Sequence, residues 1–411
     1  MMKFKIKLLS LLLAISGQAF AADSIKIALT GPFSGGSAPM GVSTRDGAKL
    51  AIQEINNAGG VTIAGKKYLI DVIERDDEAK NERGALVAQE IASMNDVVAV
   101  VGTANTGVVL AGDKFYQQAK KLRIISVAAG SAAMGQWIKE GNVVPKGELY
   151  MFRFSANDGV QSEAILEEAV QKRGLKKIAI LADDTNYGVS GRDDLLSRLK
   201  NMPGVEVVAV EKFSIGSKDM TAQLLKAKTA GAEGLFAIGI GPELAAIANG
   251  KTKLGLKAPM FGSWTLSMGN FLDNAGAAAN GTMMPQTFIQ EDYTPRAKSF
   301  IKNYQATYRI DRIPSPVSAA QGYDSIKLLA AAIEQAGSTN SKAIKDALEG
   351  LQKPVEGAIA KWNRPYSTWD PAHPETHEAF RKERIVIGVV KDGRVTFAHE
   401  KDKKRLEQLD R

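Results

Sequence analysis

The sequence predicts an α/β protein with two similar lobes, each a mostly parallel sheet wrapped by helices. Apolar, β-rich runs alternate with segments of helical period over most of the 411 residues, and such alternation is typical of parallel sheets. The alternation begins twice, at Ile25 and again at Ile178, after an interruption around residues 143–156. The chain is also long enough for two domains with full hydrophobic cores.

The expected elements follow one another in order along the chain. Strands are expected at 25–29, 68–73, 97–101, 124–127, 178–181, 205–210 and 235–238, and helices between them at 44–57, 79–94, 108–121, 160–172, 190–200, 220–229 and 243–253. The last third adds helices at 295–308, 319–336 and 341–349 and strands at 385–390 and 394–397. Asp392-Gly393 predicts a hairpin turn between the last two strands. In such a fold, ligands bind beyond the carboxyl ends of the parallel strands.

The first 21 residues predict a cleaved Sec signal peptide. MMKFKIK is basic, LLSLLLAISG is apolar but too short to span a bilayer, and Ala19-Phe20-Ala21 fits a cleavage site. No later stretch is apolar for long enough to be a transmembrane helix. The chain has no cysteine, which excludes thiol catalysis, thiolate metal sites and a lipid anchor. A free periplasmic protein is therefore expected.

The charge of the chain disfavours nucleic acid as a partner. Without the three lysines of the leader, the net charge falls from +8 to +5, and the excess is spread widely apart from the basic tail at 399–411. A nucleic-acid binder concentrates its positive charge in a patch or stripe. We interpret the tail, EKDKKRLEQLDR, as a solvated end.

Two glycine-rich turns resemble nucleotide loops only in part. In GPFSGGSAPMG, Gly36 and Gly41 have Walker A spacing, but Val42-Ser43 stands where the phosphate-binding lysine is needed. Residues 239–244, GIGPEL, lack the third glycine of a dinucleotide fingerprint, and Pro242 suits the start of a helix. No cofactor is expected. The first loop still suits a carboxylate, because it places small residues and backbone amides at a helix N-terminus.

Three further loops follow expected strands. Residues 102–107, GTANTG, and 128–131, AAGS, come after neighbouring strands and offer room, hydroxyls and amides for a ligand; the alternative is that both are only tight turns. Residues 183–188, DDTNYG, occupy the corresponding place in the second half, where capping and a turn explain the acids better than acid–base chemistry. Tyr187 could close over a ligand there.

Catalytic and metal sites have little support. Asp370, His373 and His377 could be drawn as metal ligands, but two prolines in DPAHPETHEAF disfavour a regular helical face. No GxSxG elbow occurs. We therefore expect no enzyme, with a metal-dependent hydrolase as the weaker alternative.

The leader, IKIALTGPFSG, DGAKLAIQEINNAGG, VVAVVG and NYG together resemble the type I periplasmic solute-binding proteins, in particular the branched-chain amino acid (leucine/isoleucine/valine) ABC transporter family. This resemblance implies two Rossmann-like lobes joined by three crossover strands, with the ligand cleft between them. It places the N-terminal lobe at 24–152 and 286–354 and the C-terminal lobe at 153–285 and 355–398.

The resemblance also implies ligand contacts. Thr106 matches the hydroxyl residue that holds the ligand carboxylate, and Tyr187 matches the tyrosine of the second lobe. Gly130 replaces a threonine, for which Ser131 would substitute only if its loop shifts, and Met40 replaces an aromatic residue. The expected ligand-binding residues are Met40, Ala104, Asn105, Thr106, Ala128, Ala129, Gly130, Ser131, Tyr187 and Trp264.

Two departures from the family pattern concern the ligand's α-ammonium group. The glutamate expected to pair with it is replaced by Trp264, and a second tyrosine is replaced by Ile240 or Gly241. Burying an ammonium without a counter-ion costs several kcal/mol. We therefore expect an aromatic or aliphatic acid that lacks the α-amino group. The alternative is that the alignment slips by a few residues and another acid serves.

The resemblance implies a monomeric protein that captures its solute by hinge closure and delivers it to an inner-membrane ABC permease. A ligand-sensing input module for a membrane receptor is the alternative.

Overall fold

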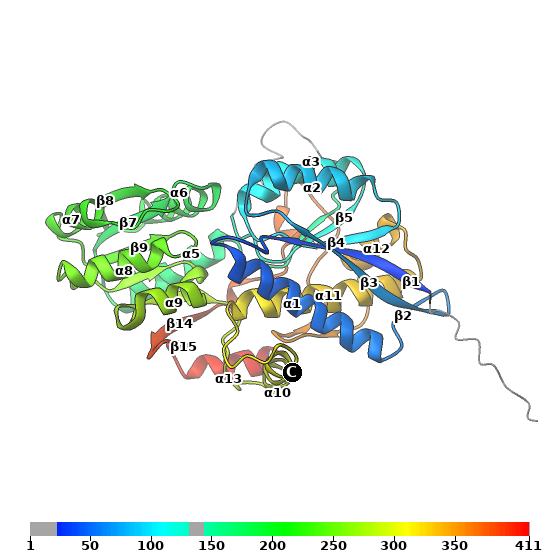
Figure 1. The fold of residues 1–411 in the computed structure, drawn as a ribbon. Coiled ribbons are helices and arrows are strands. Elements are labelled where there is room, and N and C mark those ends of the chain that lie inside the picture. Colours follow the sequence, from blue (N-terminus) through cyan, green and yellow to red (C-terminus); the bar gives the residue numbers. More distant parts are fainter. Residues whose placement is uncertain (1–22, 131–143, 411) are drawn as a thin grey trace, which may run out of the picture.

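The computed structural model describes residues 23–130 and 144–410, so the predicted leader lies outside the described residues. Two sheets lie in separate lobes beside each other, the first built mostly from the blue part of the chain and the second mostly from the green part (Figure 1).

The first sheet has the strand order β2-β3-β1-β4-β5-β6. Its strands are β1 (Ser24–Gly31), β2 (Val61–Ile63), β3 (Lys66–Asp76), β4 (Val97–Gly102), β5 (Leu122–Ile125) and β6 (Met151–Arg153). All neighbours pair in parallel except β2 and β3. Every residue of β4 and β5 is buried, because both faces of a parallel sheet are covered by helices.

The second sheet has the order β15-β14-β11-β10-β9-β7-β8. Its strands are β7 (Lys177–Asp183), β8 (Glu206–Phe213), β9 (Gly234–Ile238), β10 (Met260–Gly262), β11 (Met283–Gln286), β14 (Val386–Lys391) and β15 (Arg394–Phe397). The last two form an antiparallel hairpin. The φ angles of Asp392 and Gly393 are +47° and +74°, as a type I′ turn requires, so the predicted hairpin is confirmed. A separate two-stranded ribbon joins β12 (Val355–Glu356) and β13 (Lys361–Trp362).

Helices cover both sheets. They are α1 (Ala38–Asn57), α2 (Asn81–Ser93), α3 (Thr106–Gln118), α5 (Asp158–Leu166), α6 (Asn186–Leu199), α7 (Thr221–Thr229), α8 (Glu243–Lys253), α9 (Gly269–Ala275), α10 (Pro295–Tyr308), α11 (Pro316–Ala336), α12 (Ser341–Glu349) and α13 (Lys401–Leu409). The helix predicted at 160–172 divides into α5 and a π-helical segment, η1 (Glu167–Lys172). Short 3-10 turns follow at η2 (Trp264–Ser267), η3 (Gly276–Ala279), η4 (Pro374–His377) and η5 (Lys382–Arg384).

The chain passes between the lobes three times: after β6, after β11 and before β14. Helices α10, α11 and α12 return to the first lobe, where α11 packs along α1 (Figure 1). The expected fold of two α/β lobes joined by three crossovers is confirmed. The lobe boundaries at 152, 285 and 354 remain predictions.

The C-terminal tail is more ordered than a solvated end would be. Residues 401–409 form helix α13, and its Leu406 is buried against Ile289, Val386 and Phe397. The tail is so highly charged that its sequence pattern did not predict the burial of Leu406. None of the described helices is both long and apolar enough to cross a membrane.

Candidate ligand-binding site

The N-termini of α3 and α6, one from each lobe, face each other. A Cβ atom added to Gly107, the second residue of α3, would lie less than 3.0 Å from the side-chain oxygens of Asn81 and Asn186. Asn186 is the first residue of α6, which Thr185 caps by accepting a hydrogen bond from the amide of Gly188 at 3.4 Å. The positive ends of two helix dipoles therefore converge where the lobes meet, next to Thr106 and Tyr187.

The hydroxyl of Thr106 is tied to the loop after β5 as a hydrogen-bond acceptor. Its Oγ1 atom accepts a hydrogen bond from the amide of Gly130 at 3.1 Å, which leaves its own proton free to point elsewhere. A Cβ atom at Gly130 would lie less than 3.0 Å from two atoms of the Thr106 side chain. Glycine at position 130 is therefore required by the close approach of these two residues.

The loop after β5 uses most of its backbone groups within the protein. The carbonyl of Ala128 accepts from the Ser155 hydroxyl at 2.8 Å, and the carbonyl of Ala129 accepts from the amide of Asp158 at 2.9 Å. The side chain of Ala128 packs in a cluster with Trp369, whereas Ala129 packs with the apolar cluster that contains Trp264. Ser131 lies outside the described residues.

The first glycine-rich loop closes one side of the site. The amide of Asn105 donates to the hydroxyl of Ser37 in this loop at 3.4 Å, and the Asn105 Oδ1 atom is buried without a hydrogen-bond partner. From the other lobe, the amide of Asn270 donates to the carbonyl of Gly36 at 3.3 Å. Met40 is completely buried and shares one apolar cluster with Ala104. The loop thus contacts both lobes.

Tyr187 lies in the second lobe beside two hydroxyls and a buried acid. Burial raises the pKa of the Tyr187 phenol well above its usual value; the charge of Asp158 adds to this rise, and the hydroxyls of Ser263 and Thr265 oppose it. The phenol oxygen is buried and forms no hydrogen bond with good geometry. Asp158, the first residue of α5, was not among the predicted site residues.

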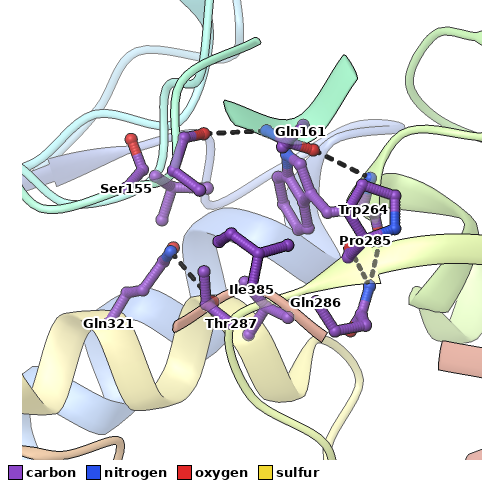
Figure 2. A pocket seen from close by; sticks show the side chains of 11 residues that line it. Ser155, Gln161, Trp264, Pro285, Gln286, Thr287, Gln321 and Ile385 are labelled. Atoms are coloured by element: carbon purple, nitrogen blue, oxygen red, sulfur yellow. Dashed lines mark hydrogen bonds between the residues drawn. The ribbon is translucent and has the colours of Figure 1, made fainter. Parts of the chain in front are cut away.

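Trp264 is held by two glutamines from the crossover regions. Its amide donates to Gln161 Oε1 at 3.2 Å, and its carbonyl accepts from Gln286 Nε2 at 3.2 Å (Figure 2). Ile240, which stands where the second tyrosine was expected, packs in the same apolar cluster as Trp264 and Tyr187. Gln161 and Gln286 were not predicted, because neither belongs to a motif and Gln161 is separated from Trp264 by 103 positions.

A small hinge cavity lies beside Trp264. It is lined by Val127, Ser155, Ala156, Gln161, Trp264, Pro285, Gln286, Thr287, Val317, Gln321 and Ile385, so all three crossovers contribute to it (Figure 2). Its volume of about 10 Å³ suits a single water molecule rather than a solute. The amide of Gln321 donates to Thr287 at 3.3 Å, while its Oε1 atom has no partner.

The three side chains of the metal alternative do not gather in one place, although Asp370 and His373 pair through their backbones. His377 is fully buried, with Nδ1 2.7 Å from the carbonyl of Met151 and Nε2 3.0 Å from Glu349. His373 is exposed, and Asp370 pairs with Lys146. Within the described ranges, no group of three or more His, Cys, Asp or Glu side chains could hold a metal ion.

A buried polar cluster supports the loop that carries Thr106. Thr103 has a φ of +59°, and its hydroxyl accepts from Arg123 Nη2 at 2.9 Å and lies 3.0 Å from the hydroxyl of Thr30. Arg123 also pairs with Asp113, and burial lowers the pKa of Arg123 to about 9. This network holds Thr103 in a backbone conformation that is uncommon for a non-glycine residue.

Asp77, near this cluster, makes stability depend on pH. Burial raises the pKa of Asp77 to about 6; the charges of Asp76 and Glu78 add to the rise, and an amide hydrogen bond from Ala79 and the charge of Arg123 oppose it. The unfolded value is about 3.9, so the folded state binds this proton more tightly. The contribution of the Asp77 proton to the free energy of unfolding is present in full below pH 4 and is lost as the pH rises to about 6.

The free energy of unfolding should fall between pH 4 and pH 7 in the wild type. We expect this fall to be about 1–2 kcal/mol smaller in Asp77→Asn. Urea denaturation at several pH values measures it. Asp324, whose pKa burial raises to about 7, titrates in both proteins, so the difference between them isolates Asp77. Equal pH dependence in the two proteins would contradict the prediction.

Two α/β lobes joined by three crossovers, with predicted site residues of both lobes beside facing helix ends, are the architecture of a solute-binding protein. A family model described as "Periplasmic binding protein" matches residues 24–376. The Leu/Ile/Val-binding protein homolog 3 of Brucella melitensis is 28% identical over 357 residues, which cover 84% of this chain and 90% of that protein. The chain belongs to the periplasmic binding protein family, as a type I member of its branched-chain amino acid group.

Solved structures share this fold. The branched-chain amino acid transporter substrate binding protein LivJ of Streptococcus pneumoniae, in complex with isoleucine, is 26% identical with a TM-score of 0.75, covering 91% of this chain and 98% of that one. An ABC transporter solute-binding protein of R. palustris, in complex with benzoate, has a TM-score of 0.73 at 19% identity, covering 91% and 95%. At 19% identity the likeness concerns the fold alone.

Proposed function

We propose that this protein is the periplasmic solute-binding component of an ABC importer and is exported by its predicted signal peptide. We further propose that it binds a small carboxylate-bearing solute and does not require an α-amino group on it. The family supports the transport role. The carboxylate follows from the site: the donor hydroxyl of Thr106 lies where the N-termini of α3 and α6 converge, and both dipoles favour an anion there.

Trp264 supports the absence of a required amino group. Where amino-acid binders of the family are expected to carry a glutamate, the chain has the buried Trp264, whose backbone amide and carbonyl are hydrogen-bonded by Gln161 and Gln286. Asp183, the other buried acid near Tyr187, already accepts hydrogen bonds from Thr185 and from the amide of Ile240. An aromatic or aliphatic acid would meet an apolar surface here rather than a counter-ion.

Asp158 favours a second candidate, an amino acid. It is buried, and its charge acts on Tyr187, so it could face an α-ammonium group. The named ligand of the S. pneumoniae relative, isoleucine, agrees with this candidate. The two candidates differ in the ligand that stabilises the protein and in the need for Asp158.

Thermal-shift and calorimetric titration with leucine, isoleucine and valine against benzoate and cinnamate separates the candidates. We expect the aromatic acids to stabilise the protein, by about 2.7 kcal/mol at a hundredfold excess over Kd, and Asp158→Asn to leave their binding unchanged. Stabilisation by leucine alone, lost in Asp158→Asn, would establish the amino acid instead. Mass spectrometry of the solute released from freshly purified, denatured protein gives an independent answer.

A further inference from the structure

Arg153 connects two crossovers through a buried ion pair. It is the last residue of β6, where the first crossover begins, and its guanidinium holds both carboxylate oxygens of Glu378 in the third crossover, with Nε 2.8 Å from Oε2. The carbonyl of Arg153 also accepts from the amide of Ala379 at 3.0 Å. Both side chains are almost fully buried, with exposures of 1% and 6%. A buried ion pair is weak evidence for stability, because desolvation offsets its attraction.

The same guanidinium reaches the ligand site. Its third contact, from Nη1, is to the carbonyl of Gly130 at 2.7 Å. The amide of Gly130 in turn donates to the Thr106 hydroxyl at 3.1 Å. A Cβ atom at Gly130 would lie less than 3.0 Å from two atoms of Thr106, so the two residues are in close contact. Hydrogen bonds therefore run without a break from Glu378 through Arg153 and Gly130 to Thr106.

We propose that Arg153 and Glu378 are positioning residues that fix the Thr106 hydroxyl for a ligand carboxylate and tie its orientation to the arrangement of the first and third crossovers. The proposal rests on the proposed function for the identity of the ligand group. Residues in the crossovers absorb the backbone changes of lobe closure. A backbone change in either crossover alters the Arg153–Glu378 pair. This moves the carbonyl of Gly130, whose amide bonds the Thr106 hydroxyl.

The test variant removes both charges, Arg153→Met with Glu378→Gln, so that no lone charge remains buried. The matched control removes another buried pair, Lys345→Met with Glu349→Gln, in which Glu349 contacts His377 beside Glu378 and neither side chain bonds Gly130. Hydrogen exchange resolved to single amides compares Gly130 with Val101 in β4. We expect exchange at Gly130 to rise about tenfold in the test variant, with Val101 and the control variant nearly unchanged.

A second measurement tests recognition of the ligand carboxylate. Calorimetry compares benzoate with benzamide and L-leucine with L-leucinamide, so that each pair differs only in the carboxylate. We expect the preference for the carboxylate to fall about tenfold in the test variant and to persist in the control. An equal loss for acid and amide indicates a merely structural role and overturns the proposal.

The two hypotheses fail separately. Wild-type protein that binds neither acid overturns the carboxylate part of the proposed function, while the exchange of Gly130 still decides whether Arg153 orients the loop. Gly130 exchange that is equal in all three proteins overturns the positioning role, even if carboxylates bind.

Discussion

Thr106→Val is expected to weaken the binding of a carboxylate solute by about 30-fold, the effect of losing one hydrogen bond to a charged group. Valine keeps the shape of threonine, so the close contact with Gly130 persists. The substitution removes the donor and also the acceptor that the amide of Gly130 uses. Isothermal titration with the acid that stabilises the wild type most strongly measures the loss.

Thr106→Ser is the matched control, because it keeps the hydroxyl and deletes only a methyl group. We expect it to bind within about threefold of the wild type. Equal weakening in the serine and valine variants would show that packing matters at this position and the hydroxyl does not. Wild-type affinity in Thr106→Val would remove Thr106 from the site.

Local chemistry made part of the fold predictable. The predicted bounds of α8, α10, α12 and β15 agree with the structure, because residues at their ends act locally. Thr294 caps α10 beside Pro295, and Asn340 accepts two amide hydrogen bonds at the start of α12. Strands of three or four residues such as β2, β10 and β11 were missed, because they are too short for a period and depend on pairing with distant strands.

In the candidate site, too, features set by local sequence were predictable and features set by tertiary contacts were not. The loops that carry Thr106 and Tyr187 were expected from their places after strands, since parallel strands gather these loops at one edge. Thr106 itself was expected from the resemblance to the family. Arg153 and Glu378, separated by 225 positions, carry no motif, and their connection depends on how the crossovers meet. The close approach that requires glycine at position 130 is likewise a tertiary contact. Spacing in the sequence could not show either one.

Gly322→Ala is expected to destabilise the protein by about 3 kcal/mol, through the crossing of α1 and α11. A Cβ atom at Gly322 would lie less than 3.0 Å from the carbonyl oxygen of Thr44, and one at Gly47 would do the same to the carbonyl of Ala319. Two helix backbones therefore touch at a reciprocal pair of glycines. Replacing glycine by alanine within a helix gains about 1 kcal/mol in propensity, but separating two packed helices costs more.

Thermal denaturation should show a Tm about 4 °C lower for Gly322→Ala. Gly36→Ala is the control, because no atom lies within 4 Å of its added methyl group and its φ is not in the left-handed region. Equal Tm values for the two variants would contradict the close approach. The crossing also bears on binding: α1 carries Met40 in its first turn, and Gln321 of the hinge cavity precedes Gly322. Helices forced apart here should therefore lower ligand affinity together with stability.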